Sequence, residues 1–416
     1  MEDIKLKKIV ALLMATALVF ALVGCATGNK DNNAGTNQGD APGGDQALTL
    51  KIWAAQDDQA LTRKLADKFI EAHPEYNLTI ELGVVGEPDA YKTFSEDPTA
   101  AADVFFFPND QLRDFVSAVG LSEVTRNKDA IISRNIASSI DAATLDGSLW
   151  AYPMTADNGF FLYYDKSILS EDDVKSLDRI LEVTQAAGKQ FHMNVSNSWY
   201  IASFFLGAGG SLSIGPDGRQ VCDFNNANGL AAAKAIQALT ANPAFIDGDD
   251  NVLVGGLGGS ISAGVSGAWK AEDIEAKLGA NYAATKLPTF TLDGKQVQMG
   301  SFGGYKLIGV NSTITDPAKL SAAFALADFL SNEESQLLRF EERKMGPSNI
   351  NAASNPAVQA NIALAALAAQ NVYATSQNDV LGGYWTPAGA FGTAMVNQTT
   401  EDLQSLLDNM VAQIQS

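Results

Sequence analysis

Residues 103–107 constrain the fold of this chain more than any other stretch. The run Asp103-Val104-Phe105-Phe106-Phe107 is apolar at every position after its first acid, and Pro108 ends it. A strand that is apolar on both faces needs cover on both faces, as a strand has inside a parallel sheet flanked by helices. The run therefore predicts an α/β fold.

A β-α-β unit precedes this run. Residues 48–54 and 78–82 alternate between apolar and polar side chains as strands do, and the helix predicted between them has its apolar stripe in residues 61–69. In such a unit, the loop after the first strand faces the ligand crevice. That loop is residues 55–58.

The alternation of strands and helices continues along the chain, with candidate crossings between lobes near residues 155, 304 and 350. Three crossings between two α/β lobes predict a hinged cleft, with loops after strands at its edge. The expected N-lobe is residues 47–155 with about 305–350. The expected C-lobe is residues 156–304 with about 351–416.

The chain begins with the pattern of a secretory signal. Lysines precede an apolar run that is short for a membrane span, and the run ends in Leu22-Val23-Gly24-Cys25. This ending resembles a bacterial lipoprotein lipobox, which implies cleavage after residues 1–24 and a lipid such as palmitate on Cys25. Residues 25–46 have the composition of a solvated tether. A plain signal peptide or an N-terminal anchor is the alternative.

Charge and cysteine content exclude several classes of partner and cofactor. The chain has 28 basic and 48 acidic residues, and a surface this acidic argues against nucleic acid or anionic membrane as a partner. If Cys25 carries lipid, Cys222 has no disulfide partner and is expected to be a buried thiol. Neither His73 nor His192 has a Cys or His at ligand spacing, so no metal or other cofactor is expected.

Carboxylates, amides and large aromatic side chains gather on the loops that follow the predicted strands, where basic residues are few. Carboxylates and amides form paired hydrogen bonds with adjacent hydroxyls, and Trp and Tyr rings stack on the C–H face of a sugar. The pattern therefore predicts a carbohydrate site. Its candidate residues are Gln56, Asp57, Phe107, Asn109, Asp110, Asp157, Asn158, Trp199, Trp269, Tyr305, Tyr384 and Trp385.

Several interpretations remain open at this level. Asp57 and Asp110 stand where an aspartate commonly caps a helix. Trp53 and Trp150 lie in strand-like runs, where core packing competes with ligand contact. Two other functions also place acids and aromatics in a cleft. One is a secreted glycoside hydrolase, which needs two carboxylates flanking one bond, and the other is a receptor for a different solute, such as a polyamine or a peptide.

A series of segments between residues 48 and about 400 carries a likeness to a known family. They are Leu50-Lys51-Ile52-Trp53 with Asp57, Asp103 to Asp110, Gly120 to Thr125, Gly147 to Pro153, Tyr164-Asp165-Lys166, Gly209-Gly210, Gly267 to Trp269, Leu287 to Phe290, and Gly309-Val310-Asn311. In order and spacing they resemble the extracellular solute-binding proteins of carbohydrate ABC transporters, the maltose/maltodextrin-binding group in particular. The resemblance implies a two-lobed periplasmic-binding-protein fold with a hinged cleft, in a receptor that closes on sugar outside the cytoplasmic membrane and presents it to a permease. Such a receptor is not an enzyme, and its mechanism needs only a monomer.

The resemblance also assigns roles to single residues. Acidic positions that contact sugar hydroxyls fall on Asp57, Asp110 and Asp157. Aromatic positions that stack on sugar rings fall on Phe107, Trp199 and Trp269, with Trp385 near the last of them. Three positions depart from the pattern, because Asp58 and Gln111 replace basic residues and Asn197 replaces an acid. These departures bear on α-glucan specificity and leave the sugar class unchanged.

Overall fold

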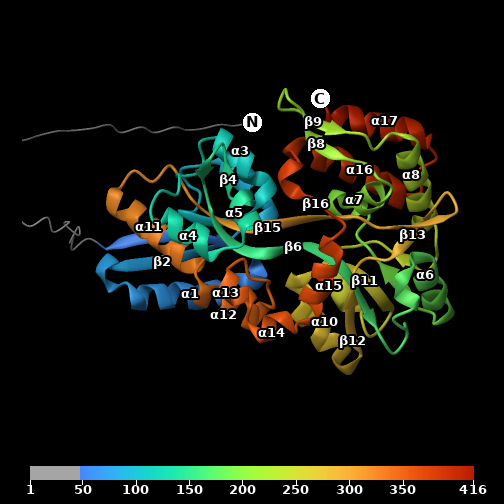
Figure 1. The fold of residues 1–416 in the computed structure, drawn as a ribbon, viewed down its shortest axis with the longest axis horizontal. Helices are drawn as coiled ribbons and strands as arrows, with labels where there is room; N and C mark the ends of the chain where they lie inside the picture. Colours follow the sequence, from blue (N-terminus) through green and yellow to red (C-terminus); the bar gives the residue numbers. More distant parts are fainter. Residues whose placement is uncertain (1–46) are drawn as a thin grey trace, which may run out of the picture. The chain divides into compact units, whose positions relative to one another are not determined.

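The computed structural model describes residues 47–416, so the proposed signal, tether and lipid attachment at Cys25 lie outside the described residues. One mixed sheet runs through this part of the chain, in the order β10-β7-β11-β6-β15-β3-β1-β2 (Figure 1). Its strands are β10 (Phe245–Ile246), β7 (Gln190–His192), β11 (Ile261–Gly267), β6 (Tyr152–Asp165), β15 (Ser301–Val310), β3 (Val104–Pro108), β1 (Leu48–Ala54) and β2 (Leu78–Val84), with β12 (Tyr282–Thr285) paired to β6 and β16 (Ala374–Ser376) paired to β15.

The first hydrophobic core draws on residues 50–154 and 307–330, and we call the elements packed on it the N-lobe. Strand β1 pairs in parallel with β2 and β3, and every residue of β3 is buried, as its apolar run predicts. Helix α1 (Gln59–Ala72) turns its apolar stripe into this core. The other N-lobe helices are α2 (Ala90–Glu96), α3 (Leu112–Ser117), α4 (Lys128–Arg134), α5 (Ala137–Ala142), α11 (Pro317–Leu330) and α12 (Glu333–Arg343).

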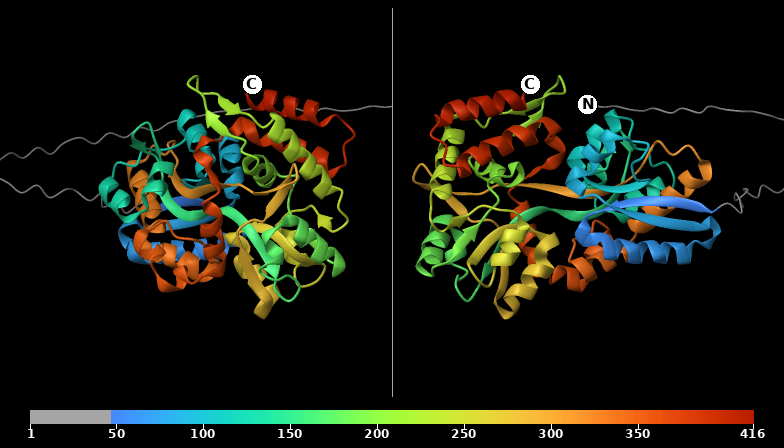
Figure 2. Two further views of the ribbon diagram at one scale, coloured as in Figure 1. Left: turned by 45° about the vertical axis from the view of Figure 1, so that its right-hand side comes forward. Right: turned by 180° about the vertical axis from the view of Figure 1, so that it is seen from behind.

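A second core and a smaller cluster draw on residues 160–302 and 363–414, and the elements around them form the C-lobe (Figure 2). Cys222 is buried in this core, as the sequence predicts. The C-lobe helices are α6 (Leu177–Ala186), α7 (Ser198–Gly207), α8 (Ala227–Thr240), α9 (Asp250–Gly256), α10 (Ala271–Leu278), α15 (Ile362–Asn371), α16 (Trp385–Val396) and α17 (Leu403–Ile414). The short helices α13 (Ile350–Ala353) and α14 (Pro356–Gln359) follow α12 and precede α15 in the chain.

The chain passes between the two cores three times. Strand β6 contributes Met154 to the first core and Phe160 to the second, and β15 contributes Phe302 to the second core and Leu307 to the first. The third pass lies between α12, which packs on the first core, and α15, which packs on the C-lobe cluster. Strands β6 and β15 are paired with each other, antiparallel, where they pass from one core to the other.

Some element boundaries differ from the sequence-based expectation. Two separate strands were expected on either side of residue 155, but β6 is continuous because its pairing with β15 extends across the crossing. The helical pattern of residues 318–342 divides into α11 and α12, because the side chain of Asn332 caps a new helix by accepting from the backbone N–H of Ser335 at 2.8 Å. The predicted hairpin at Asp293-Gly294 is confirmed, and it joins β13 (Thr289–Leu292) to β14 (Lys295–Gln298). Both turn residues have positive φ, 47° and 77°.

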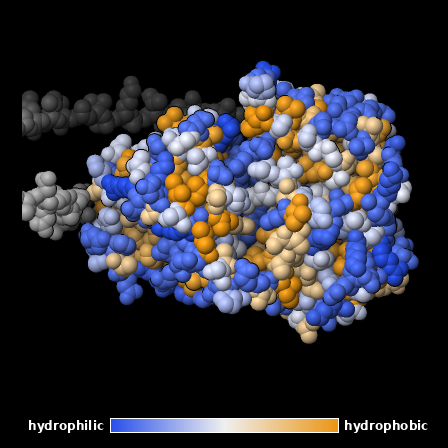
Figure 3. Space-filling view, in the orientation of Figure 1, coloured by the Kyte–Doolittle hydropathy of each residue, from blue (hydrophilic) through white to orange (hydrophobic). Residues whose placement is uncertain are grey.

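The face of the molecule seen in Figure 3 is covered mainly by polar residues, with apolar residues in separate patches. Within residues 47–416, no helix has both the length and the apolar character needed to cross a bilayer. In the same range, no group of three or more His, Cys, Asp or Glu side chains is placed to hold a metal ion.

Candidate functional site

Six of the twelve predicted site residues belong to three groups near the crossing of β6 and β15, together with residues that the sequence did not single out. The first, which we call the amide cluster, consists of Asn109, Asp110, Asn158, Gln377 and Asn378. The second, the ionic cluster, consists of Asp57, Asp58, Glu87, Lys270, Lys306 and Arg343. The third is the aromatic pair Trp199 and Trp269.

The amide cluster joins the loop after β3, the crossing strand β6 and the short 3₁₀ helix η8 (Gln377–Asp379). Gln377 donates from Nε2 to Oδ1 of Asp110 at 2.7 Å and accepts at Oε1 from Nδ2 of Asn158 at 3.0 Å. Asn109 donates to Oδ1 of Asn378 and accepts from the backbone N–H of Tyr305 at 2.7 Å. Since the side chains of Gln377 and Asn109 each donate one hydrogen bond and accept another, the orientations of these two amides are set by their neighbours.

The amide cluster packs so closely against Gly304 on β15 that no side chain fits at this position. A Cβ at this position would lie 2.5 Å from Oδ1 of Asn109 and 2.9 Å from Oε1 of Gln377. Any side chain at residue 304 would therefore push apart two members of the amide cluster.

Asp110 has an unusual protonation equilibrium in this cluster. Burial raises its pKa to about 7, although the hydrogen bond from Gln377 acts in the opposite direction. The indole of Trp385, the first residue of α16, is another donor beside this carboxylate. Asp110 is not a helix cap, and neither is Asp57, since neither side chain accepts a capping hydrogen bond from a backbone N–H.

The ionic cluster links the N-lobe loops after β1 and β2 to β15, α12 and the C-lobe. Nζ of Lys270 lies 2.7 Å from Oδ2 of Asp57, an ion pair between the two lobes that lowers the pKa of Asp57 through the hydrogen bond from Lys270. Arg343 pairs with Asp58 at 3.0 Å and reaches Glu272 of the C-lobe at 3.8 Å. The acids of this cluster thus have cationic partners within the protein.

Lys306 is the most deeply buried cation of the ionic cluster. Its Nζ lies 3.1 Å from Oε1 of Glu87, and both side chains are about nine-tenths buried. Burial alone would lower the pKa of Lys306, but Glu87, Asp58 and Asp157 raise it above its usual value. Its ammonium also lies 5.7 Å from the ring centroid of Trp269, which is on the C-lobe.

Asp157 lies at the hinge and ties two of the three passes together. It is 2% exposed, and its Oδ2 accepts from the backbone N–H of Gly346 at 2.6 Å. Among residues 47–416, no group forms a hydrogen bond with its Oδ1. Burial raises the pKa of this carboxyl, and the nearby charge of Lys306 acts against that rise.

The aromatic pair lies on the C-lobe. Trp199 is near the start of α7, and its backbone N–H donates to the side chain of Asn197 at 2.8 Å, so Asn197 caps this helix. The rings of Trp199 and Trp269 are 5.7 Å apart. Both residues are only partly buried, so each keeps some surface for contact with a ligand.

Other candidates lie elsewhere. Phe107 and Tyr384 are fully buried in the N-lobe and C-lobe cores, so neither ring has surface for a ligand, and we leave both out of the proposed contact set. Gln56 is exposed beside Asp57, and the hydroxyl of Tyr305 bonds Ser138 at 2.7 Å. The sequence left Trp53 and Trp150 undecided between core packing and ligand contact. Trp53 lies in the N-lobe core, where its side chain is 6% exposed. Trp150 packs on that core and donates to the carbonyl of Leu145.

Sequence reasoning missed several residues of the site. Lys306 was passed over, although a lysine that opens the apolar run of β15 is a visible signal of a buried, paired charge. Glu87 and Gln377 have no such signal, because polar residues are ordinary in loops. Their importance depends on the partners that the fold brings to them.

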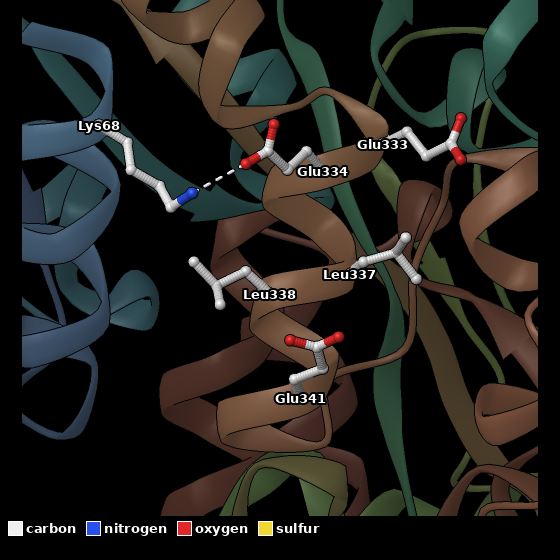
Figure 4. Close-up of a pocket in the computed structure, with 6 residues that line it drawn as sticks. All are labelled: Lys68, Glu333, Glu334, Leu337, Leu338 and Glu341. Atoms are coloured by element: carbon white, nitrogen blue, oxygen red, sulfur yellow. Dashed lines mark hydrogen bonds and ion pairs between the residues drawn. The ribbon is translucent and has the colours of Figure 1, made fainter. Parts of the chain in front are cut away.

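A pocket of about 440 Å³ lies apart from these groups, between α1 and α12 of the N-lobe (Figure 4). Lys68 reaches across it to Glu334 at 2.9 Å, with Leu337 and Leu338 on the α12 side. None of the residues predicted to bind ligand lines this pocket, and we assign no ligand to it.

Comparisons with known proteins agree with the expected fold. A family model described as bacterial extracellular solute-binding protein matches residues 64–366. A solved structure with acarbose is 30% identical, with a TM-score of 0.81, and the match covers 89% of this chain and 99% of that one. The maltodextrin-binding protein MalE1 from L. casei BL23, solved without ligand, is 26% identical with a TM-score of 0.72, covering 89% and 100%. The maltotriose-binding protein of Thermus thermophilus, bound with maltotriose, shares the fold at 18% identity and a TM-score of 0.75, covering 88% and 99%.

Proposed function

Because the chain belongs to the bacterial extracellular solute-binding protein family, we propose that it captures a maltodextrin-like oligosaccharide and delivers it to an ABC permease. The observation that carries this proposal is the likeness, along nearly the whole described chain, to sugar-binding structures. The protein acts as a monomer, held at the extracellular face of the cytoplasmic membrane by a lipid on Cys25.

The charges between the lobes support a neutral, hydroxyl-rich ligand. Asp57, Asp58 and Glu87 each have a cationic partner within 3.1 Å, so these acids do not need a cation from the ligand. A polyamine would have to displace these partners, whereas a sugar can share their hydrogen bonds. The proposed contacts are Gln56, Asp57, Asn109, Asp110, Asp157, Asn158, Trp199, Trp269, Tyr305 and Trp385.

The proposed mechanism is binding with lobe closure. The two lobes divide near residues 155, 304 and 350, and β6 with β15 serves as the hinge. A ligand that contacts both lobes stabilises the closed form by its differential affinity for that form. The family and the similar structures are binding proteins and not enzymes. We therefore propose that no bond of the ligand is broken. Because a glycoside hydrolase also uses two carboxylates, the experiment below includes a test for hydrolysis.

Titration calorimetry against maltose, maltotriose, longer maltodextrins, acarbose, peptides and polyamines tests the ligand class. The expected result is binding of an oligosaccharide, which chromatography then recovers intact. Solution scattering should show a smaller radius of gyration for the protein with the sugar than without it. Binding of polyamines or peptides alone would overturn the proposal, as would cleavage of the sugar or an unchanged radius.

A further inference from the structure

The ring of Trp269 is held at its edge by Asp250, a residue at the start of α9. Nε1 of Trp269 donates to Oδ2 of Asp250 at 2.7 Å. The other oxygen of the same carboxylate, Oδ1, accepts from Oγ of Ser266, also at 2.7 Å. Since both oxygens have a donor, the carboxylate cannot rotate without losing a hydrogen bond.

Asp250 is available for this contact because its neighbour caps the helix. The side chain of Asp249 accepts from the backbone N–H groups of Asn251 and Val252 at 3.0 and 3.2 Å. Asp250 is therefore not required as the cap of α9, and its carboxylate is directed to the indole of Trp269 instead.

Gly267, the last residue of β11, restricts the same ring from another direction. A Cβ at residue 267 would lie 2.0 Å from Cζ3 and 2.2 Å from Cη2 of Trp269. The backbone of Gly267 is extended, with φ of −102°, which any residue can adopt. The glycine is thus needed for the space that the indole occupies and not for its backbone conformation.

The contacts of the ring place it at the junction of the lobes. Trp199 of the C-lobe lies 5.7 Å from it, and the ammonium of Lys306 on the hinge strand β15 lies 5.7 Å from its centroid. Trp269 is also the residue before Lys270, which pairs with Asp57 of the N-lobe. The orientation of this ring therefore affects what can contact it from both lobes.

From these contacts we propose that Asp250 is a positioning residue, which holds the ring of Trp269 in the orientation that stacks on the sugar. The inference rests on the proposed function, because the stacking role of Trp269 does. Without Asp250 the indole can rotate, and the ligand must then immobilise it on binding. That conformational entropy corresponds to about a three- to tenfold loss of affinity.

Three variants test this with the sugar that binds wild type best, starting from maltotriose and acarbose. Asp250→Ala should bind about three- to tenfold more weakly, and Asp250→Asn, which keeps an acceptor for the indole, should stay within about twofold of wild type. Asp408→Ala is the matched control, since Asp408 also accepts two side-chain hydrogen bonds in the C-lobe, from Asn225 and Gln404. It should bind as wild type does.

A readout without ligand separates this inference from the proposed function. In a ¹⁵N-labelled protein, the indole N–H signal missing from Trp269→Phe is that of Trp269. In Asp250→Ala this signal should move upfield and exchange faster with water, and in Asp250→Asn it should move less. An unmoved signal, or unchanged affinity in Asp250→Ala, would overturn the positioning role. A wild-type protein that binds no sugar would overturn the proposed function and the ligand role together, while the indole signal would still report whether Asp250 orients the ring.

Discussion

Nε2 of Gln377 donates a hydrogen bond of 2.7 Å to Oδ1 of Asp110, joining residues that are 267 positions apart in the chain. Gln377 follows β16, which pairs with the C-lobe end of β15, and Asp110 follows β3 of the N-lobe. The bond therefore couples the lobes through a side chain that is 3% exposed. A second bond from Asn158 on β6 fixes the orientation of the same amide.

Gln377→Ala should weaken sugar binding and lower stability by about 1–3 kcal/mol, because Asp110 and Asn158 each lose a buried partner. The control is Gln370→Ala, which removes a fully buried glutamine that bridges Leu287 and Ser301 in the C-lobe. Both variants should unfold at lower urea concentration, but only Gln377→Ala should show reduced affinity in calorimetry. Equal affinities in the two variants would contradict a role for Gln377 in the site.

Asp110 should make stability fall as pH rises from about 4 to about 7. Its folded-state pKa of about 7 exceeds the ordinary 3.8, so in this window the folded state binds more protons than the unfolded state, and the slope is negative. The full effect is at most about 4 kcal/mol. Asp110→Asn should flatten the urea-unfolding profile across this range, whereas Asp141→Asn at an exposed position should leave the wild-type slope.

Lys306→Met should destabilise the protein by about 3–5 kcal/mol, because it leaves Glu87 buried without its cation. The double variant Lys306→Met with Glu87→Gln removes both charges and should recover part of the loss. Urea unfolding at constant pH measures both. If the double variant is less stable than Lys306→Met alone, the loss comes from packing and not from the unpaired charge.

The ion pair between Asp57 and Lys270 should contribute to ligand affinity, because it joins the two lobes. A double-mutant cycle with Asp57→Asn and Lys270→Met should give a coupling energy of about 0.2–1 kcal/mol in the affinity, decreasing as salt is added. The exposed pair of Asp172 and Lys175 lies within the C-lobe and serves as the control cycle. It should show no coupling in the affinity, and an equal coupling in both cycles would exclude a specific role for the pair between the lobes.

Cys25→Ala should release the protein from cells into the medium while leaving sugar affinity unchanged, since no proposed contact residue belongs to the segment 25–46. Fractionation of cells and medium measures the release, and calorimetry measures the affinity. Retention of Cys25→Ala on the membrane would argue against a lipid at this position.

Sequence patterns predicted the fold best where the residues of one element alone show which of its faces must be buried. The apolar run of β3 requires cover on both faces, and the stripe of α1 requires one buried face, so both are visible in the residues alone. The sequence also predicted the hairpin at Asp293-Gly294, because its turn needs residues that adopt positive φ. Boundaries failed where a distant partner decides them, as in the continuous strand β6, which β15 extends across the crossing.

The site was predicted less completely than the fold. The loops that carry Asp57, Asp110 and Trp269 could be placed from the strands before them, but residue type could not separate core from surface. Phe107 and Tyr384 have the side chains of a sugar site and lie in the two cores. Glu87, Lys306 and Gln377 were missed because a buried charge or amide is informative only once its partner is known.

The sequence by itself determined the α/β class and the likeness to sugar receptors, because these depend on periodicity and on motifs in a constant order. Only the tertiary structure decided which acids are neutralised, that Gln377 bridges Asp110 to Asn158, and that Asp250 holds the ring of Trp269. Hydrogen bonds and ion pairs require contact within a few ångströms, and side chains hundreds of residues apart meet at that distance only when the chain is folded.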